Sequence, residues 1–112
     1  MTLSELLAQL SQHPVDFQTV MQVIETEYSF TPAHFINGDL VNEANTNNGS
    51  CKIFAFGLLN QLSKQAALNA FGDYYTQDVL KNPLGLDHQN IRNFMQTGWA
   101  GISYSSSALQ KK

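Results

Sequence analysis

The stretch SCKIFAFGLLNQL, residues 50–62, decides the fold class of this chain. Its apolar residues recur at helical spacing and share one stripe, formed by Cys51, Phe54, Ala55, Leu58, Leu59 and Leu62. Phe56 lies off that stripe, so we expect the helix to be buried on more than one side. Phe54 and Leu58 are expected near the centre of the core, where replacement of Leu58 by alanine would cost roughly 2–5 kcal/mol.

Helical patterns continue on both sides of this stretch. Before it, the sequence predicts a short helix near the N-terminus and a second helix that begins around residues 14–16, where a proline and an aspartate suit a first turn. After it, the sequence predicts helical segments over residues 64–72, 73–82 and 87–98. Asp87 is the expected N-cap of the last of these helices.

Regular periodicity is lost between the second and third helices. Residues 29–49 form a long asparagine-rich loop, and loops of this length are uncommon in compact domains and are often functional. We expect one short strand in it, at residues 34–36, paired with residues 102–104. The polar tail, residues 105–112, is expected to fray apart from Leu109.

The length of 112 residues suits one domain that spans the whole chain. Its expected fold is mainly α, with about five helices, a minor two-stranded β element and the long loop between the second and third helices. Hydrophobic residues make up 43% of the chain, which excludes a disordered protein. Charged residues reach only 13%, and neutral polar side chains take their place.

The charge balance excludes several classes of partner. Six lysines and arginines stand against nine aspartates and glutamates, and the basic residues are scattered, so neither nucleic acid nor an anionic membrane is an expected partner. No apolar run reaches the roughly 18 residues of a membrane-spanning helix. The single cysteine cannot form an internal disulfide, and the N-terminal residues do not resemble a signal peptide. We therefore expect a monomer in the cytoplasm.

A first block of polar residues leads into the third helix. It contains Asn42, Asn45, Asn47, Asn48, Gly49, Ser50, Cys51 and Lys52. In one interpretation these groups only cap the helix and satisfy its free backbone N–H groups. In the other they line a polar pocket, where the free N–H groups and the helix dipole favour an anion or a carboxylate. The chain has no GxGxxG or GxxxxGK[ST] pattern, so no nucleotide-phosphate site is predicted.

A second polar block opens the last helix. It contains Asp87, His88, Asn90, Arg92 and Asn93. Asn90 and Asn93 share one helix face, and His88 and Arg92 share an adjacent face. In one interpretation Arg92 and the asparagines hydrogen-bond to carbonyl groups of the 29–49 loop. In the other, the loop and the helix line a cleft in which His88 and Arg92 face a ligand.

Thiol catalysis is an alternative that uses Cys51 and His88. Cys51 would lie in the first turn of its helix, where the pKa of a thiol falls. His88 and Asn90 follow it in the chain order Cys, His, Asn of papain-like enzymes. Against this hypothesis, Cys51 shares the apolar stripe with Phe54, and His88 and Asn90 are two residues apart on a helix and converge poorly.

No metal site and no cofactor are predicted. The candidate ligands are His13, His34, His88, Cys51 and Asp87, and they show no metal-binding spacing. A second set of residues could form a peptide groove but is more typical of a core: Phe71, Tyr74, Tyr75 and Trp99.

Four motifs carry a resemblance to a known family: FING at residues 35–38, NGSCK at 48–52, FGDYY at 71–75 and DHQNIRNFM at 87–95. With them the chain resembles the HopJ family, named after a type III secreted effector of plant-pathogenic pseudomonads, over roughly residues 15–109. The resemblance implies a small bacterial protein in the bacterial cytoplasm, with type III secretion into a host as a second location. It implies no catalytic residues, because the family has no established biochemical activity.

The leading functional hypothesis is a non-enzymatic binding or interaction module for a protein or small-molecule partner. Its surface would combine the asparagine-rich loop with the helix at residues 87–95. The candidate binding residues are Asn42, Asn45, Asn48, Ser50, Lys52, His88, Asn90, Arg92 and Asn93. This hypothesis requires that the two polar blocks meet at one place. The alternative is a small hydrolase or transferase that uses Cys51 or His88.

Overall fold

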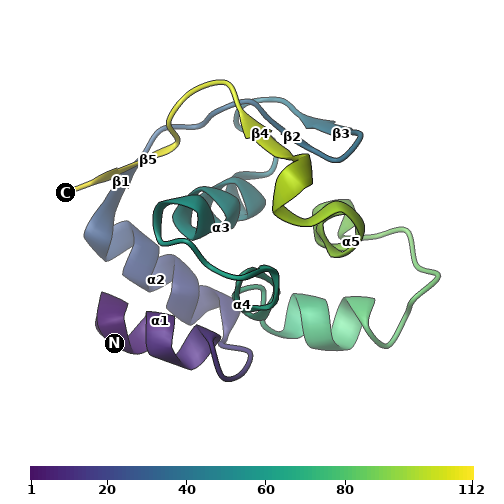
Figure 1. Cartoon of the computed structure of the whole chain (residues 1–112), viewed down its shortest axis with the longest axis horizontal. Coiled ribbons are helices and arrows are strands. Elements are labelled where there is room, and N and C mark those ends of the chain that lie inside the picture. Colours follow the sequence, from purple (N-terminus) through teal and green to yellow (C-terminus); the bar gives the residue numbers. More distant parts are fainter.

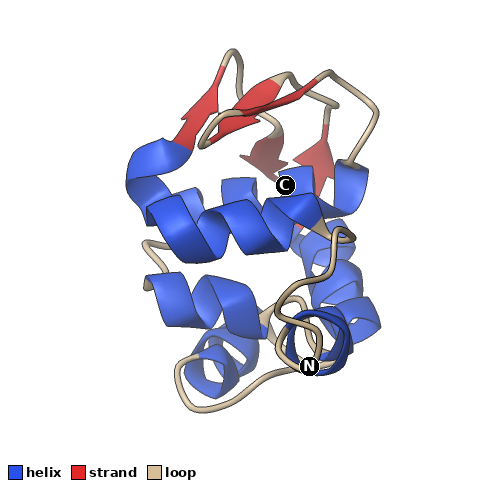
Figure 2. Cartoon of the chain, turned by 90° about the vertical axis from the view of Figure 1, so that its right-hand side faces the viewer, coloured by secondary structure: helices blue, strands red, loops and turns tan.

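The strands gather on one side of the molecule and cover a group of helices, as Figures 1 and 2 show. The structure is a computed structural model that describes residues 1–112. Its helices are α1 (Leu3–Leu10), α2 (Phe17–Glu27), α3 (Asn48–Leu59), α4 (Lys64–Asn69), the π-helical η1 (Tyr74–Val79), α5 (Gln89–Thr97) and the 3₁₀ turn η2 (Gly98–Gly101). Its strands are β1 (Tyr28–Phe30), β2 (Phe35–Asn37), β3 (Leu40–Asn42), β4 (Ile102–Tyr104) and β5 (Leu109–Lys111). None of the helices combines the length and the apolar character that crossing a membrane requires.

The strands form two small antiparallel sheets. In the first, β1 pairs with β5, and Ser29 lies opposite Gln110. In the second, β2 lies between β3 and β4, so that Ile36 lies opposite both Val41 and Ser103. Each sheet therefore joins the C-terminal part of the chain to the segment that follows α2 (Figure 1).

The helices begin in two different ways. Thr2 and Glu5 form a capping box at the start of α1, and the Asp16 carboxylate accepts hydrogen bonds from the first backbone N–H groups of α2. Helices α3 and α5 begin at Asn47 and His88 without any hydrogen bond from a capping side chain. The first-turn N–H groups of α3 and α5 are therefore not satisfied by a cap.

The core is built around α3, which packs between the other helices and the strands. The Phe54 ring lies at its centre, fully buried, with its centroid 4.8 Å from that of Phe94 and 5.5 Å from that of Phe71. The rings of Phe35 and Trp99 lie slightly farther from Phe54, at 6.1 and 6.2 Å. The predicted central position of Phe54 is confirmed, as is the burial of α3 on more than one side.

The predicted mainly α class is correct only in part, because the fold mixes helices with two sheets. The expected pairing between residues 34–36 and 102–104 is confirmed by β2 and β4. The 29–49 segment is not an irregular loop, since β2 and β3 form a hairpin within it. The tail does not fray either, because residues 109–111 pair with β1. Strands β1, β3 and β5 were not predicted, because three residues are too few to show a clear alternation of apolar and polar side chains.

Two predictions about individual residues are wrong. Leu58 is 47% exposed and does not lie at the core, because α3 is buried through Gly57 and its last turn emerges from the other elements. Asp87 is not the N-cap of α5, because His88 occupies that position. The Asp87 carboxylate instead pairs with Arg92, at 2.6 Å between Oδ1 and Nη2. In this hydrogen bond both the donor and the acceptor are charged.

Candidate functional site

Four asparagines from distant parts of the chain form a hydrogen-bonded cluster. This asparagine cluster consists of Asn37 in β2, Asn42 in β3, Asn47 at the start of α3 and Asn90 in α5. Asn42 Oδ1 accepts hydrogen bonds from Nδ2 of Asn90 at 2.9 Å and Nδ2 of Asn47 at 2.7 Å. Asn90 Oδ1 accepts from Nδ2 of Asn37 at 3.0 Å and Nδ2 of Asn42 at 3.1 Å. One network therefore connects the hairpin, the start of α3 and α5.

The register of the β2–β3 hairpin places two of these asparagines inside the molecule. Asn42 lies opposite Phe35, and Asn37 is two residues from Phe35 on the same strand, so all three side chains point to the inner face. Both asparagines are almost fully buried. An amide carries two donors and one acceptor oxygen without a charge, so amides can satisfy one another where an ion would need a neutralising partner.

A cavity of about 400 Å³ lies beside the asparagine cluster. One part of its lining is polar: Asn47, Gly49, Ser50, His88, Gln89 and Asn90. All of these except Gln89 belong to the two predicted polar blocks. The other part is apolar or aromatic: Phe17, Leu40, Phe71, Tyr74 and Ile91. The two polar blocks therefore do meet at one place, opposite an aromatic wall. No lysine, arginine, aspartate or glutamate lines this cavity.

The starts of α3 and α5 both border the cavity. Gly49 and Ser50 belong to the first turn of α3, and Gln89 and Asn90 belong to the first turn of α5. Because neither helix has a side-chain cap, the first-turn N–H groups of both helices are left without a side-chain partner beside the cavity. Helix dipoles point their positive ends toward the same region.

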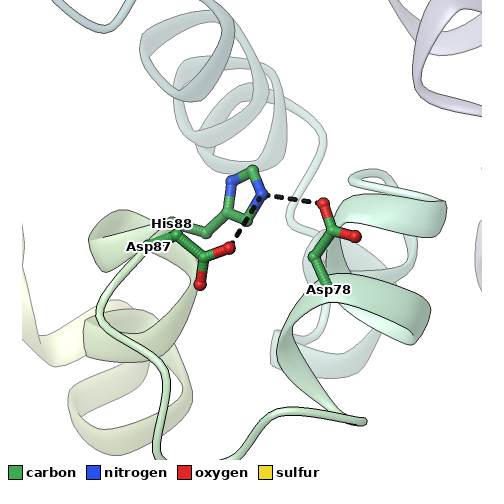
Figure 3. A group of neighbouring side chains, drawn as sticks. All are labelled: Asp78, Asp87 and His88. Carbon is green, nitrogen blue, oxygen red and sulfur yellow. Dashed lines mark hydrogen bonds and ion pairs between the residues drawn. The ribbon is translucent and has the colours of Figure 1, made fainter.

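His88 is held in one orientation at the edge of the cavity. Its backbone adopts a left-handed conformation, with φ 50° and ψ 48°, which costs a non-glycine residue about 1–2 kcal/mol. Its ring lies 5.2 Å from the Tyr74 ring, and its Nε2 atom is 3.0 Å from Oδ2 of Asp78. Nε2 also lies 3.9 Å from Oδ2 of Asp87 (Figure 3). The Nδ1 atom is on the side of the ring that faces away from both carboxylates (Figure 3).

Asp78, Asp87 and His88 form a group that could hold a metal ion. One ligand atom from each residue lies within 4.8 Å of the others. His88 and Asp87 were two of the candidate ligands in the sequence, whereas Asp78 lies in η1 and had no recognisable spacing to either of them. The fold brings the three together because η1 packs against the start of α5 (Figure 3).

Several candidate binding residues lie outside the cavity. The Lys52 ammonium lies over the Phe30 ring, 4.8 Å from its centroid. Asn48, the first residue of α3, donates a hydrogen bond to Oδ1 of Asn45 at 2.8 Å. These three side chains do not line the cavity, so only part of the first block contributes to it.

Only part of the second block lines the cavity as well. Asn93 donates hydrogen bonds to the carbonyl oxygen of Asn37 and to Oδ1 of Asp39, both at 3.1 Å, so it does fix α5 to the hairpin as one interpretation predicted. Arg92 makes no hydrogen bond to the 29–49 segment. Its guanidinium donates to the carbonyl oxygens of Asn82 and Asp87, at 2.8 and 2.6 Å, and braces the loop before α5.

The Cys51 thiol lacks the properties of a nucleophile. It is 2% exposed, and its Sγ lies 3.7 Å from the carbonyl oxygen of Ala33. Burial raises the pKa of the Cys51 thiol instead of lowering it. Tyr104 donates a hydrogen bond to the carbonyl oxygen of Cys51 at 2.7 Å and covers the same region. The expectation that the first turn of α3 lowers the pKa of this thiol is therefore wrong.

Sequence reasoning missed two residues of the site. Asn37 was not among the candidate binding residues, although its side chain belongs to the buried asparagine cluster. Phe17 was not singled out either, but it lines the cavity together with Tyr74, with ring centroids 5.1 Å apart. An Asn–Gly pair is typical of a turn, and only the hairpin register shows which way the Asn37 side chain points.

Comparisons with known proteins find one family and one solved structure. Residues 3–109 match the model of a family described as HopJ type III effector protein. The chain is also similar to a protein described as "unknown function protein VPA0580", whose crystal structure aligns with a TM-score of 0.97 at 57% sequence identity. That alignment covers 100% of this chain and 95% of the other chain. No match was found among curated proteins.

Proposed function

The chain belongs to the HopJ type III effector protein family, and on this premise we propose that it is a non-enzymatic binding module for a small polar molecule. The molecule would occupy the cavity between the starts of α3 and α5. One observation carries the proposal: residues of both polar blocks, including Ser50 and Asn90, line a single cavity opposite Phe17, Phe71 and Tyr74. A concave site with an apolar wall and a few convergent polar groups is the usual form of a small-molecule site.

The lining suggests the chemistry of the ligand. A volume of about 400 Å³ lies toward the lower end of the range for small-molecule pockets, roughly 300–1,000 Å³. The polar side offers amide, hydroxyl and backbone N–H groups and no charged side chain other than His88 when protonated. We therefore expect a compact ligand that presents hydrogen-bond acceptors to α3 and α5 and an apolar or planar surface to Tyr74.

The geometry supports binding over catalysis. In the alternative of a hydrolase or transferase, Cys51 is not available as a nucleophile, because it is buried in the core. His88 does line the cavity, but its ring makes hydrogen bonds or ion pairs only to Asp78 and Asp87. No serine, threonine, tyrosine or cysteine side chain is hydrogen-bonded to the imidazole, so an activated nucleophile of the serine or cysteine type is not assembled.

A ligand screen with cavity variants tests the proposal. Thermal-shift and ligand-observed NMR screening of a metabolite panel should find compounds that bind the wild-type protein. Ser50→Leu fills the polar side of the cavity and Tyr74→Ala removes part of the aromatic wall, so both should weaken binding by more than about tenfold. Ser103→Leu, an exposed change in β4 outside the lining, is the matched control and should bind normally. Binding that survives Ser50→Leu and Tyr74→Ala would contradict the proposal.

We infer that the protein acts as a monomer in the bacterial cytoplasm. The family description adds type III export into a host cell as a second location. Fractionation of bacteria that produce a tagged chain, with and without an active type III secretion system, distinguishes the two. Secretion that depends on the system would place the binding function in the host instead.

A further inference from the structure

We propose that Asp78, Asp87 and His88 form a binding site for a divalent transition-metal cation of the Zn²⁺ type. The three residues come from η1 and from the start of α5, and their potential ligand atoms all lie within 4.8 Å of one another. His88 Nε2 lies 3.0 Å from Asp78 Oδ2 and 3.9 Å from Asp87 Oδ2 (Figure 3). This site goes beyond the proposed small-molecule binding, because neither Asp78 nor Asp87 lines the cavity.

These atoms lie near the spacing that a metal ion requires, but they span up to 4.8 Å, so the two carboxylates must move closer together to bind one ion. Zn²⁺ binds imidazole nitrogen and carboxylate oxygen at about 2.0–2.2 Å, so tetrahedral ligand atoms stand roughly 3.3 Å apart. The two distances from His88 Nε2 lie on either side of that value. Both carboxylates are partly exposed, 46% for Asp78 and 59% for Asp87, so small rotations of their side chains can adjust the geometry.

The surroundings hold the ligands in place. Arg92 Nη2 donates to Oδ1 of Asp87 at 2.6 Å and leaves Oδ2 directed toward His88. A metal-binding carboxylate is commonly fixed in this way through its second oxygen. The left-handed backbone of His88 and the contact with Tyr74 limit the movement of the imidazole ring.

The donor set indicates which cations would bind. One imidazole nitrogen and two carboxylate oxygens suit Zn²⁺ and neighbouring first-row ions, whereas Mg²⁺ and Ca²⁺ prefer oxygen alone. Three protein ligands leave at least one coordination position open. Because His88 also lines the cavity, that position can be approached by a water molecule or by a ligand held there.

Calorimetric titration of the metal-free full-length chain with ZnCl₂ tests the site. We expect one equivalent to bind to the wild-type protein and MgCl₂ to give no saturable binding. Asp78→Asn and His88→Asn should each weaken Zn²⁺ binding by more than about tenfold. Asparagine is chosen at His88 because it tolerates the left-handed conformation. His34→Asn changes a histidine that lies outside the group and contacts Ser105, so it should bind Zn²⁺ like the wild type.

Several results would overturn the site. The first is an absence of saturable Zn²⁺ binding to the wild-type protein. The second is a Zn²⁺ affinity of Asp78→Asn and His88→Asn equal to that of the wild type. The third is binding of Mg²⁺ as tight as that of Zn²⁺. If a variant unfolds, the imidazole ¹⁵N spectrum of the wild-type protein decides the question, since Zn²⁺ must shift the Nε2 signal of His88. Ser50→Leu should retain Zn²⁺ binding, so a failure of the metal site and a failure of the small-molecule site are distinguishable.

Discussion

The molecule contains two buried clusters that hold α5 in place by different physics. The aromatic cluster around Phe54 joins α3, α5 and β2 through ring contacts that depend on volume and shape. The asparagine cluster joins α3 and α5 to both strands of the β2–β3 hairpin through amide hydrogen bonds, which depend on direction. The comparison suggests a division of roles, because apolar contacts supply most of the stability while directional bonds fix the position of the cavity lining.

The largest effect is expected in the aromatic cluster. Phe54→Ala removes a fully buried ring and should lower the free energy of unfolding by about 3–5 kcal/mol. Phe54→Leu keeps most of the volume and should cost clearly less. Urea denaturation measures both variants. Equal losses for alanine and leucine would show that the ring is not held by packing.

Substitutions in the asparagine cluster should lower the free energy of unfolding by less, and an apolar residue of similar volume should not compensate for the loss. Asn90→Ala leaves donors of Asn37 and Asn42 without their acceptor and should cost about 2–3 kcal/mol. Asn90→Leu, which is close in volume, should not restore the loss, in contrast to the conservative change at Phe54. If Asn90→Leu is as stable as the wild type in urea denaturation, the cluster is not held by hydrogen bonds.

The smallest loss of stability is expected for a substitution at Leu58, which serves as a reference for both clusters. The sequence pattern alone placed it in the core, but it is 47% exposed in the last turn of α3. Leu58→Ala should therefore cost less than about 1 kcal/mol, below the 2–3 kcal/mol expected for Asn90→Ala. A loss of several kcal/mol on thermal or urea unfolding would mean that Leu58 is covered in solution.

The sequence allowed the helices and the central position of Phe54 to be predicted, because both follow from a repeated pattern. The stripe through Phe54 has helical spacing, and residues at that spacing share a face whatever the rest of the chain does. The same stripe misplaced Leu58, since periodicity identifies a face but not the point at which neighbouring elements stop covering it. Strands β1 and β3 had no pattern that predicted them, and β5 at residues 109–111 depends on a partner about eighty residues earlier.

The sequence indicated several residues of the candidate site but not how these residues are arranged in space. Asn42, Ser50, His88 and Asn90 were singled out because amides and a histidine were dense in two blocks, and the fold does bring these blocks to one cavity. Asp78 could not be found in this way. It meets His88 only because η1 packs against the start of α5, a contact that neither residue type nor spacing predicts.

A double-mutant cycle between Asn42 and Asn90 tests most directly whether the two polar regions form one unit. The variants are Asn42→Ala, Asn90→Ala and the double variant, and the free energy of unfolding is measured for each. Two hydrogen bonds link these side chains, so we predict a coupling energy of about 1–2 kcal/mol. Losses that add to within about 0.5 kcal/mol would contradict the account, because the hairpin and α5 would then be stabilised independently and would define no common site.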